Sequence, residues 1–142
     1  MKGKLINENP RTFAVIFDTG DEVAEGLKQF AREHKLSASQ FTAIGAFSEV
    51  LLGFFSFENK DYKKIPITEQ VEVLSLIGDI ALEGAEPKVH AHVVLGKSDG
   101  TAHGGHLLRA HVRPTLEVIL TESPKHLHRQ PDAETGLALI RL

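Results

Sequence analysis

The sequence predicts an α/β fold of the α+β type, in which many strands accompany one clear helix. Short segments rich in branched and aromatic residues recur along the chain with turn residues between them, which is typical of strands. Two pairs of such segments, within residues 49–67 and 87–112, have the form of β-hairpins. One stretch, residues 19–35, shows apolar residues at helical spacing instead.

The composition is that of a globular protein, with 42% hydrophobic and 25% charged residues among 142. We therefore expect residues 1–142 to form a single domain. No apolar run approaches the roughly 20 residues that a membrane span needs. The N-terminal residues lack the apolar core of a signal peptide, so we expect a cytoplasmic protein with no membrane partner. Because the sequence has no cysteine, any metal must be held by His, Asp or Glu.

The charge pattern argues against nucleic-acid binding by the isolated chain. The net charge is −3, and the longest basic cluster is the pair Lys63 and Lys64. A protein that binds duplex DNA usually gathers Lys and Arg on one face. The aromatic residues are mostly Phe within apolar runs, so they do not alternate with Lys and Arg as base-stacking residues do.

The first predicted elements are a strand and a helix. Residues 12–17 form an apolar, β-rich segment, which indicates a buried strand. Thr19 and Glu22 then have the spacing of a capping box, with Thr19 as the N-cap. His34 and Lys35 are expected in the last helical turn, where positive charge complements the helix dipole. The apolar stripe of this helix comprises Val23, Ala24, Leu27, Phe30 and Ala31.

The next segments predict strands that pair as neighbours. Residues 41–44 are expected to form a strand that breaks at Gly45, and residues 49–57 a central strand. Residues 62–67 return as its hairpin partner, and Pro66 places that partner toward a sheet edge.

The rest of the chain continues the strand pattern. Residues 70–78 are predicted as a strand, with Val71, Val73, Ser75 and Ile77 on one face and Leu74 and Leu76 on the other, and residues 79–83 can extend it past a bend at Gly78. The segments after the second hairpin turn are a strand at 107–112 that ends at Pro114, a strand at 115–122, a loop or one weak helical turn at 123–136, and a last strand at 137–142.

The second hairpin carries candidate metal ligands. His90 and His92 are two residues apart, so on a strand they point to one face, about 7 Å apart. Neutral imidazole is a common metal ligand, and His106 is the natural third ligand. A two-residue turn would place His106 opposite Val93, on the wrong face. A three-residue loop at 98–100, with Gly100 in the left-handed conformation, places it opposite His92.

A bulge at Gly104 and Gly105 is a second way to bring the three imidazoles to one face. We expect these two glycines to allow a close approach of the backbone. The alternative is that the histidines line a half-exposed sheet face without any metal, and the spacing leaves both interpretations open.

At these residues the sequence resembles the plant-and-prokaryote conserved (PPC) domain family, in its stand-alone prokaryotic form without an AT-hook. The resemblance runs from about Thr12 to Leu142. It is carried by Pro87, His90 and His92, by Asp99-Gly100, by Gly104-Gly105-His106-Leu107, and by residues 115–118, 44–47 and 52–55.

The resemblance implies a largely antiparallel β-sheet flanked by a few helices, a homotrimer, and a histidine-lined metal site. It implies no settled biochemical activity. Three histidines with an open fourth position are the arrangement of catalytic zinc, in which bound water has a pKa of about 7. Zinc is therefore the first choice of cofactor, although nickel, copper and iron also suit imidazole.

Several other polar residues are candidates for a role at the site. Glu117 could act as a base or orient a histidine, or it could be a solvated charge on an apolar strand. His103 and His111 fall on the face opposite His106 by simple alternation. His126 and His128 lie in a polar segment and are interpreted as surface residues.

The favoured function is a trimeric binding or interaction module, in which a metal organises a pocket for a small molecule or stabilises the assembly. The alternative is a metal-assisted hydrolase or lyase that uses the open coordination position. A further alternative is DNA binding, by analogy with the plant members, which carry AT-hooks that this chain lacks.

Overall fold

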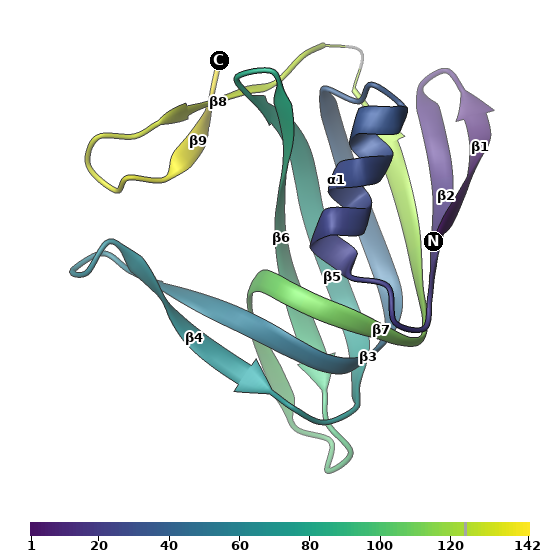
Figure 1. Ribbon diagram of the computed structural model, residues 1–142, viewed down its shortest axis with the longest axis vertical. Coiled ribbons are helices and arrows are strands. Elements are labelled where there is room, and N and C mark those ends of the chain that lie inside the picture. Colours follow the sequence, from purple (N-terminus) through teal and green to yellow (C-terminus); the bar gives the residue numbers. More distant parts are fainter. Residues whose placement is uncertain (124) are drawn as a thin grey trace.

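The computed structural model describes residues 1–123 and 125–142, which contain one helix and nine strands (Figure 1). The elements are β1 (Lys2–Glu8), β2 (Arg11–Asp18), α1 (Val23–Glu33), β3 (Ala38–Ser56), β4 (Asp61–Ile67), β5 (Val71–Glu83), β6 (Glu86–Gly96), β7 (Ala102–Glu122), β8 (His128–Pro131) and β9 (Ala138–Arg141). All strand pairs are antiparallel except β5 with β8. The predicted α+β fold with a largely antiparallel sheet is confirmed, with a single helix in the described residues.

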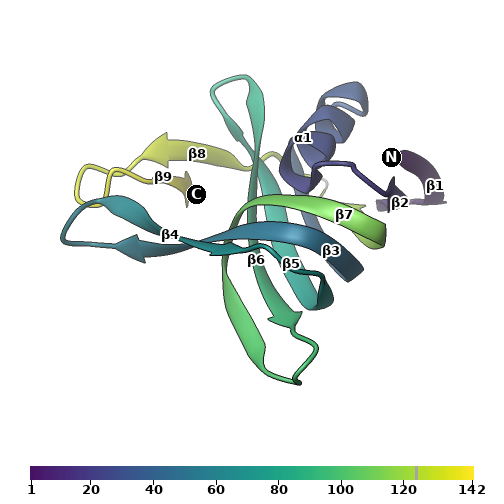
Figure 2. The ribbon, with the colours of Figure 1, turned by 60° about the horizontal axis from the view of Figure 1, so that its bottom comes forward.

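Two long strands organise the sheet. β7 pairs through its first residues with β6 and through the rest with β3 and β2. β5 lies between β3 and β6, so β3, β5, β6 and β7 form a closed ring of strand pairs. β3 and β7 bend across β5 and β6 (Figure 2). As a result, β6 and the first part of β7 are neighbours, which positions the histidines of both.

The helix covers one face of this sheet (Figure 1). Its buried residues are Val23, Leu27, Phe30 and Ala31, as the predicted stripe requires, while Ala24 is half-buried. They pack on the inward side chains of the strands, among them Phe13, Val15 and Phe17 of β2. α1 is the one helix in the described residues, and it is too short to cross a membrane.

The predicted N-cap is wrong. The N-cap is Glu22, whose carboxylate accepts a hydrogen bond from the backbone N–H of Glu25 at 2.7 Å. The Thr19 hydroxyl donates instead to the carbonyl of Pro114 at 3.1 Å. Before the helix begins, Asp21 accepts the N–H of Asp18 at 2.9 Å and closes a turn. Residues 18–21 therefore turn the chain, and the helix starts after them.

Two predicted strand breaks are also wrong. β3 continues through Gly45, where its pairing with both β5 and β7 shifts register. Gly45 has φ +152, and a Cβ there would lie 2.3 Å from the carbonyl oxygen of Thr115. β7 likewise continues through Pro114, because that residue falls in the irregular stretch opposite Gly45 and so breaks no regular ladder bond. Glycine and proline thus bend these strands without ending them.

The hairpin of β3 with β4 is confirmed, and in the described residues β4 pairs with β3 alone, at an edge. In β5 the predicted alternation is wrong after Val73, because a bulge at Leu74 shifts the pairing with β6. Leu74 is exposed, whereas Leu76 is buried together with Val71 and Val73. The predicted loop at 123–136 contains β8, which pairs with β5; its Pro124 lies outside the described residues.

Candidate metal centre

The hairpin of β6 and β7 brings three histidines together. His92 and His106 are direct partners across the two strands. The connection is the predicted three-residue loop, closed by a 2.9 Å hydrogen bond from Lys97 N–H to the carbonyl of Thr101, and Gly100 has φ +83. Pairing is regular over residues 92–96 and 102–106, so the register needs no glycine bulge there. Gly105 allows close packing instead: a Cβ on it would lie 3.0 Å from the Gly53 carbonyl oxygen.

The three imidazoles are close enough to share one ion. One ligand atom from each of His90, His92 and His106 lies within 4.8 Å of the other two. The ring centroids of His90 and His106 are 5.1 Å apart, and those of His92 and His106 are 5.5 Å apart. A histidine triad that could bind a metal is therefore present.

The surroundings keep two of these rings neutral. Burial, and to a smaller extent the neighbouring His90 and His92, lower the pKa of His106 to about 4. Burial also lowers the pKa of His90, although the carboxylate of Asp79 acts in the opposite direction. Neutral imidazole is the form that binds a metal. The Nδ1 atom of His106 is buried and has no hydrogen-bond partner among the described residues. An unsatisfied buried nitrogen beside two further imidazoles fits a metal ion.

An aromatic side chain that the sequence did not indicate covers His106. Tyr62 of β4 stacks on the His106 ring, with centroids 4.7 Å apart and planes 24° apart. It reaches His106 across Gly53, where a Cβ would lie 2.6 Å from a Tyr62 ring carbon. Burial raises the pKa of Tyr62. A glycine in the middle of a strand was the signal that could have revealed this contact.

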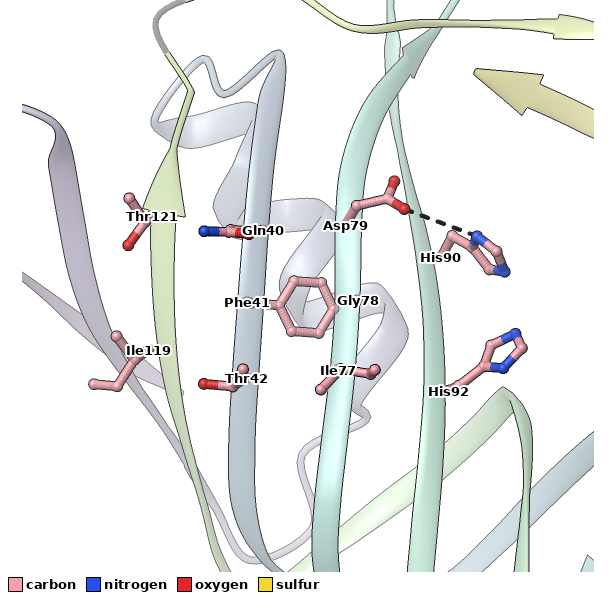
Figure 3. A pocket seen from close by; sticks show the side chains of 10 residues that line it. All are labelled: Gln40, Phe41, Thr42, Ile77, Gly78, Asp79, His90, His92, Ile119 and Thr121. Carbon is pink, nitrogen blue, oxygen red and sulfur yellow. Dashed lines mark ion pairs between the residues drawn. The ribbon is translucent and has the colours of Figure 1, made fainter. Parts of the chain in front are cut away.

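A second group that the sequence did not indicate lies beside His90. A carboxylate oxygen of Asp79 on β5 lies 3.8 Å from His90 Nδ1 (Figure 3). The other oxygen of Asp79 is paired with the guanidinium of Arg129 on β8. Asp79 is thus the acidic residue next to the triad.

Glu117 lies elsewhere on the sheet. It pairs with Ile16 of β2 and Ile44 of β3, and β3 and β5 separate this part of β7 from β6. The geometry therefore favours Asp79 over Glu117 as the residue that orients a histidine. The remaining histidines also lie outside the triad: His103 is exposed opposite Leu95, His111 contacts Glu49, His126 contacts Ser37, and His128 is exposed on β8.

A pocket of about 650 Å³ opens beside His90 and His92, on the sheet face away from α1 (Figure 3). Its walls combine polar groups of Gln40, Thr42 and Thr121 with the side chains of Ile77 and Ile119. The same face carries a patch of exposed aliphatic residues, which we call the aliphatic face: Ile44, Leu74, Ile77, Val94 and Ile119.

The model of the Plants and Prokaryotes Conserved (PCC) domain matches residues 6–124. The chain belongs to this family. Its fold is similar to that of a plant- and prokaryote-conserved protein from Pyrococcus horikoshii, at 32% identity, TM-score 0.87 and coverage of 99% and 95% of the two chains. A metal-containing protein from Archaeoglobus fulgidus is 32% identical, with TM-score 0.86 and coverage of 99% and 97%.

The crystal structure of a candidate DNA-binding protein from Bacteroides thetaiotaomicron is also similar to this PCC-domain chain. The two are 26% identical, with TM-score 0.92 and coverage of 99% of this chain and 96% of the other. Among curated proteins, the Bifunctional protein GlmU of a Synechococcus strain is 31% identical over 120 residues. That match includes 82% of this chain but 18% of the relative, so the chain spans less than a fifth of that relative's length.

Proposed function

We propose that this PCC-domain chain is a homotrimeric binding module in which His90, His92 and His106 hold one divalent transition metal, with zinc as the first choice. The observation that carries the proposal is the set of three imidazoles within 4.8 Å, one of which has a buried nitrogen without a partner in the described residues. A bound metal would supply a Lewis acid with an open position for a ligand. The adjoining pocket would receive the rest of that ligand. The metal-containing relative from Archaeoglobus fulgidus supports this proposal.

The metal content of untagged protein tests the ligand assignment. We expect wild-type protein to carry close to one metal per chain and His92→Ala to carry none. The fold should persist in this variant, because the His92 side chain is exposed whereas Ala91 and Val93 are in the core.

His126→Ala is the matched control, since His126 lies outside the triad and contacts Ser37. It should retain all the metal. Full occupancy in folded His92→Ala would show that the metal is bound elsewhere in the protein.

The aliphatic face supports the homotrimer. Five large aliphatic side chains exposed together on one sheet face are more than a monomer usually leaves in water. A partner copy that covers this face would also enclose the pocket beside His90 and His92.

A metal-assisted hydrolase or lyase is the second candidate, favoured by the pocket at the triad and by the Asp79 carboxylate beside His90. Turnover that requires the metal and disappears in His92→Ala would support it. Binding of a small molecule without any turnover would favour the module.

A further inference from the structure

An arginine from beyond the matched domain is buried next to the triad. The family match ends at residue 124, whereas Arg129 lies on β8 in the C-terminal segment. Its side chain is 5% exposed, which is rare for arginine. One terminal nitrogen donates to the Ala138 carbonyl at 3.0 Å, and the other is paired with Asp79. The hydrogen bond to Ala138 and the pair with Asp79 hold the guanidinium in place. The third nitrogen, Nε, is buried without a partner in the described residues.

Asp79 connects this arginine to the triad. Its two carboxylate oxygens face different partners, Arg129 and the Nδ1 atom of His90. The distance of 3.8 Å to Nδ1 is longer than a hydrogen bond, so the carboxylate faces the neutral ring, and a small shift would let it accept from an Nδ1–H. A carboxylate facing Nδ1 leaves the Nε2 atom of His90 free to bind an ion.

We propose that Arg129 and Asp79 are positioning residues for the metal site: Arg129 fixes the Asp79 carboxylate, and Asp79 orients the His90 ring with Nε2 toward the metal. This inference rests on the proposed metal-binding function and extends it to the C-terminal β8–β9 segment. Asp79 and Arg129 would each act through another side chain, so neither is proposed as a ligand or as a catalytic residue.

The physical basis is the hydrogen bond that a metal-bound histidine makes through its second nitrogen. A carboxylate that accepts from Nδ1 selects the tautomer whose lone pair is on Nε2, and it makes that nitrogen a stronger ligand. The carboxylate can do so only while it is itself held in place. Arg129 holds it with little loss of side-chain freedom, because packing and the Ala138 carbonyl already fix the guanidinium.

The same contacts couple the C-terminal segment to the metal. β8 pairs with β5 through Leu82 with His128 and Glu83 with Arg129. If the docked segment strengthens metal binding through Arg129, then bound metal must stabilise the docked segment by the same factor.

Zinc affinity, measured by competition with a chelator on the full chain, tests the proposal. Asp79→Asn keeps the size of the side chain and removes its charge, and we expect it to weaken binding by about 10- to 100-fold. Arg129→Met keeps much of the apolar stem and removes the guanidinium, and we expect a loss of about fivefold or more.

Arg141→Met is the matched control. Arg141 belongs to the same C-terminal hairpin and pairs with Asp132 at 2.8 Å, but it is 53% exposed and lies outside the contacts of Asp79. It should bind zinc as tightly as wild type. An equal loss in Arg141→Met would overturn the proposal, because the hairpin would then act through general stability. If Arg129→Met fails to fold, Asp79→Asn supplies the affinity measurement, since Asp79 is partly exposed.

Two further readouts separate positioning from structural support. In metal-free protein, the ring-nitrogen chemical shifts of His90 report its tautomer, and we expect Asp79→Asn and Arg129→Met to reduce the Nδ1–H form. Zinc should also slow hydrogen exchange at residues 128–141 in wild type and do so less in Asp79→Asn. Unchanged zinc affinity and an unchanged tautomer in folded Arg129→Met would overturn the inference while leaving the metal site intact. A wild-type chain that binds no zinc would instead overturn the proposed function, and the metal-free tautomer would still decide the role of Asp79 and Arg129.

Discussion

At the residue scale, His106 is the side chain whose chemistry its surroundings change most. Its pKa falls from the ordinary value of 6.5 to about 4, because burial and then His90 and His92 disfavour the charged ring. The unfolded chain therefore takes up a proton at a higher pH than the folded chain does. The stability from a neutral His106 is complete above pH 6.5 and is lost as the pH falls toward 4. It amounts to at most about 3 kcal/mol.

We therefore expect metal-free wild-type protein to lose more unfolding free energy between pH 7 and pH 4.5 than His106→Gln does. Urea unfolding at the two pH values measures the difference. His103→Gln is the control, because His103 is exposed on the other face of β7 and should follow wild type. Parallel losses in wild type and His106→Gln would contradict the prediction.

The triad itself could be predicted from the sequence, because its geometry depends on local rules. Strand alternation places His90 with His92, and the length of the 98–100 loop sets His106 opposite His92. The supporting residues could not be predicted. Asp79 and Arg129 reach His90 through strand pairings of β5 with β6 and with β8, and no local pattern specifies those pairings.

At the scale of the elements, Gly45 is a point where β3 lies very close to the backbone of β7. A Cβ would lie 2.3 Å from the Thr115 carbonyl oxygen and 2.8 Å from the Leu116 Cα, and both are backbone atoms that cannot rotate away. The φ of +152 adds strain for any other residue. We expect Gly45→Ala to lower the free energy of unfolding by about 3 kcal/mol or more, measured by urea unfolding.

Gly84→Ala separates the steric clash from the backbone strain. Gly84 also has a positive φ, +62, but nothing in the described part of the chain lies within 4 Å of a Cβ there. Gly84→Ala should lower the free energy of unfolding by about 1–2 kcal/mol, as expected for an alanine in the left-handed conformation without a steric clash. Equal costs for the two variants would mean that β3 and β7 can separate at Gly45 without loss.

Most strands could be predicted, whereas their irregularities could not. The apolar pattern of the sequence predicts β2, β4 and the two hairpins. The bulge at Leu74 and the bends at Gly45 and Pro114 depend on which strands lie on either side. Because a bulge reverses the alternation beyond it, the predicted faces of residues 74–77 are wrong although the strand is correct.

At the scale of the whole molecule, the net charge of −3 bears on DNA binding. Phosphate contacts dominate affinity for duplex DNA and need clustered basic residues. We expect no binding of duplex DNA at micromolar protein and physiological salt, measured by fluorescence anisotropy. Micromolar or tighter binding that weakens steeply as salt rises would contradict this, and would indicate a basic surface that exists only in an oligomer. The relative from Bacteroides thetaiotaomicron, which is described as a candidate DNA-binding protein, can be measured in the same assay for comparison.

The closed ring of β3, β5, β6 and β7 lies beyond what the sequence alone could predict. It requires β7 to change partners along its length, from β6 to β2. Local patterns specify strands and tight turns, but the order of distant strands depends on the whole set of contacts. That residues 1–142 form a single domain stays a prediction.

The proposed homotrimer is tested most directly at the aliphatic face. Its exposed residues include Ile44 at 60%, Ile77 at 56% and Ile119 at 46% exposure. Burying each such side chain against a partner contributes about 1.5–3 kcal/mol. We expect wild-type protein at micromolar concentration to sediment at three times the chain mass of 15.6 kDa. Ile119→Lys should shift it toward the monomer, because a lysine buried at an apolar interface must lose its hydration.

Leu5→Lys provides the control for Ile119→Lys. Leu5 is 40% exposed on β1, and its partner Phe13 is buried beneath α1, so Leu5 lies on the opposite side of the sheet from Ile119. A lysine there adds the same charge without entering the aliphatic face, so the trimer should persist. A wild-type chain that sediments near 15.6 kDa would exclude the trimer. A trimer that both lysine variants leave intact would place the subunit interface away from the aliphatic face, and the pocket beside His90 and His92 would then be open to solvent in the assembly.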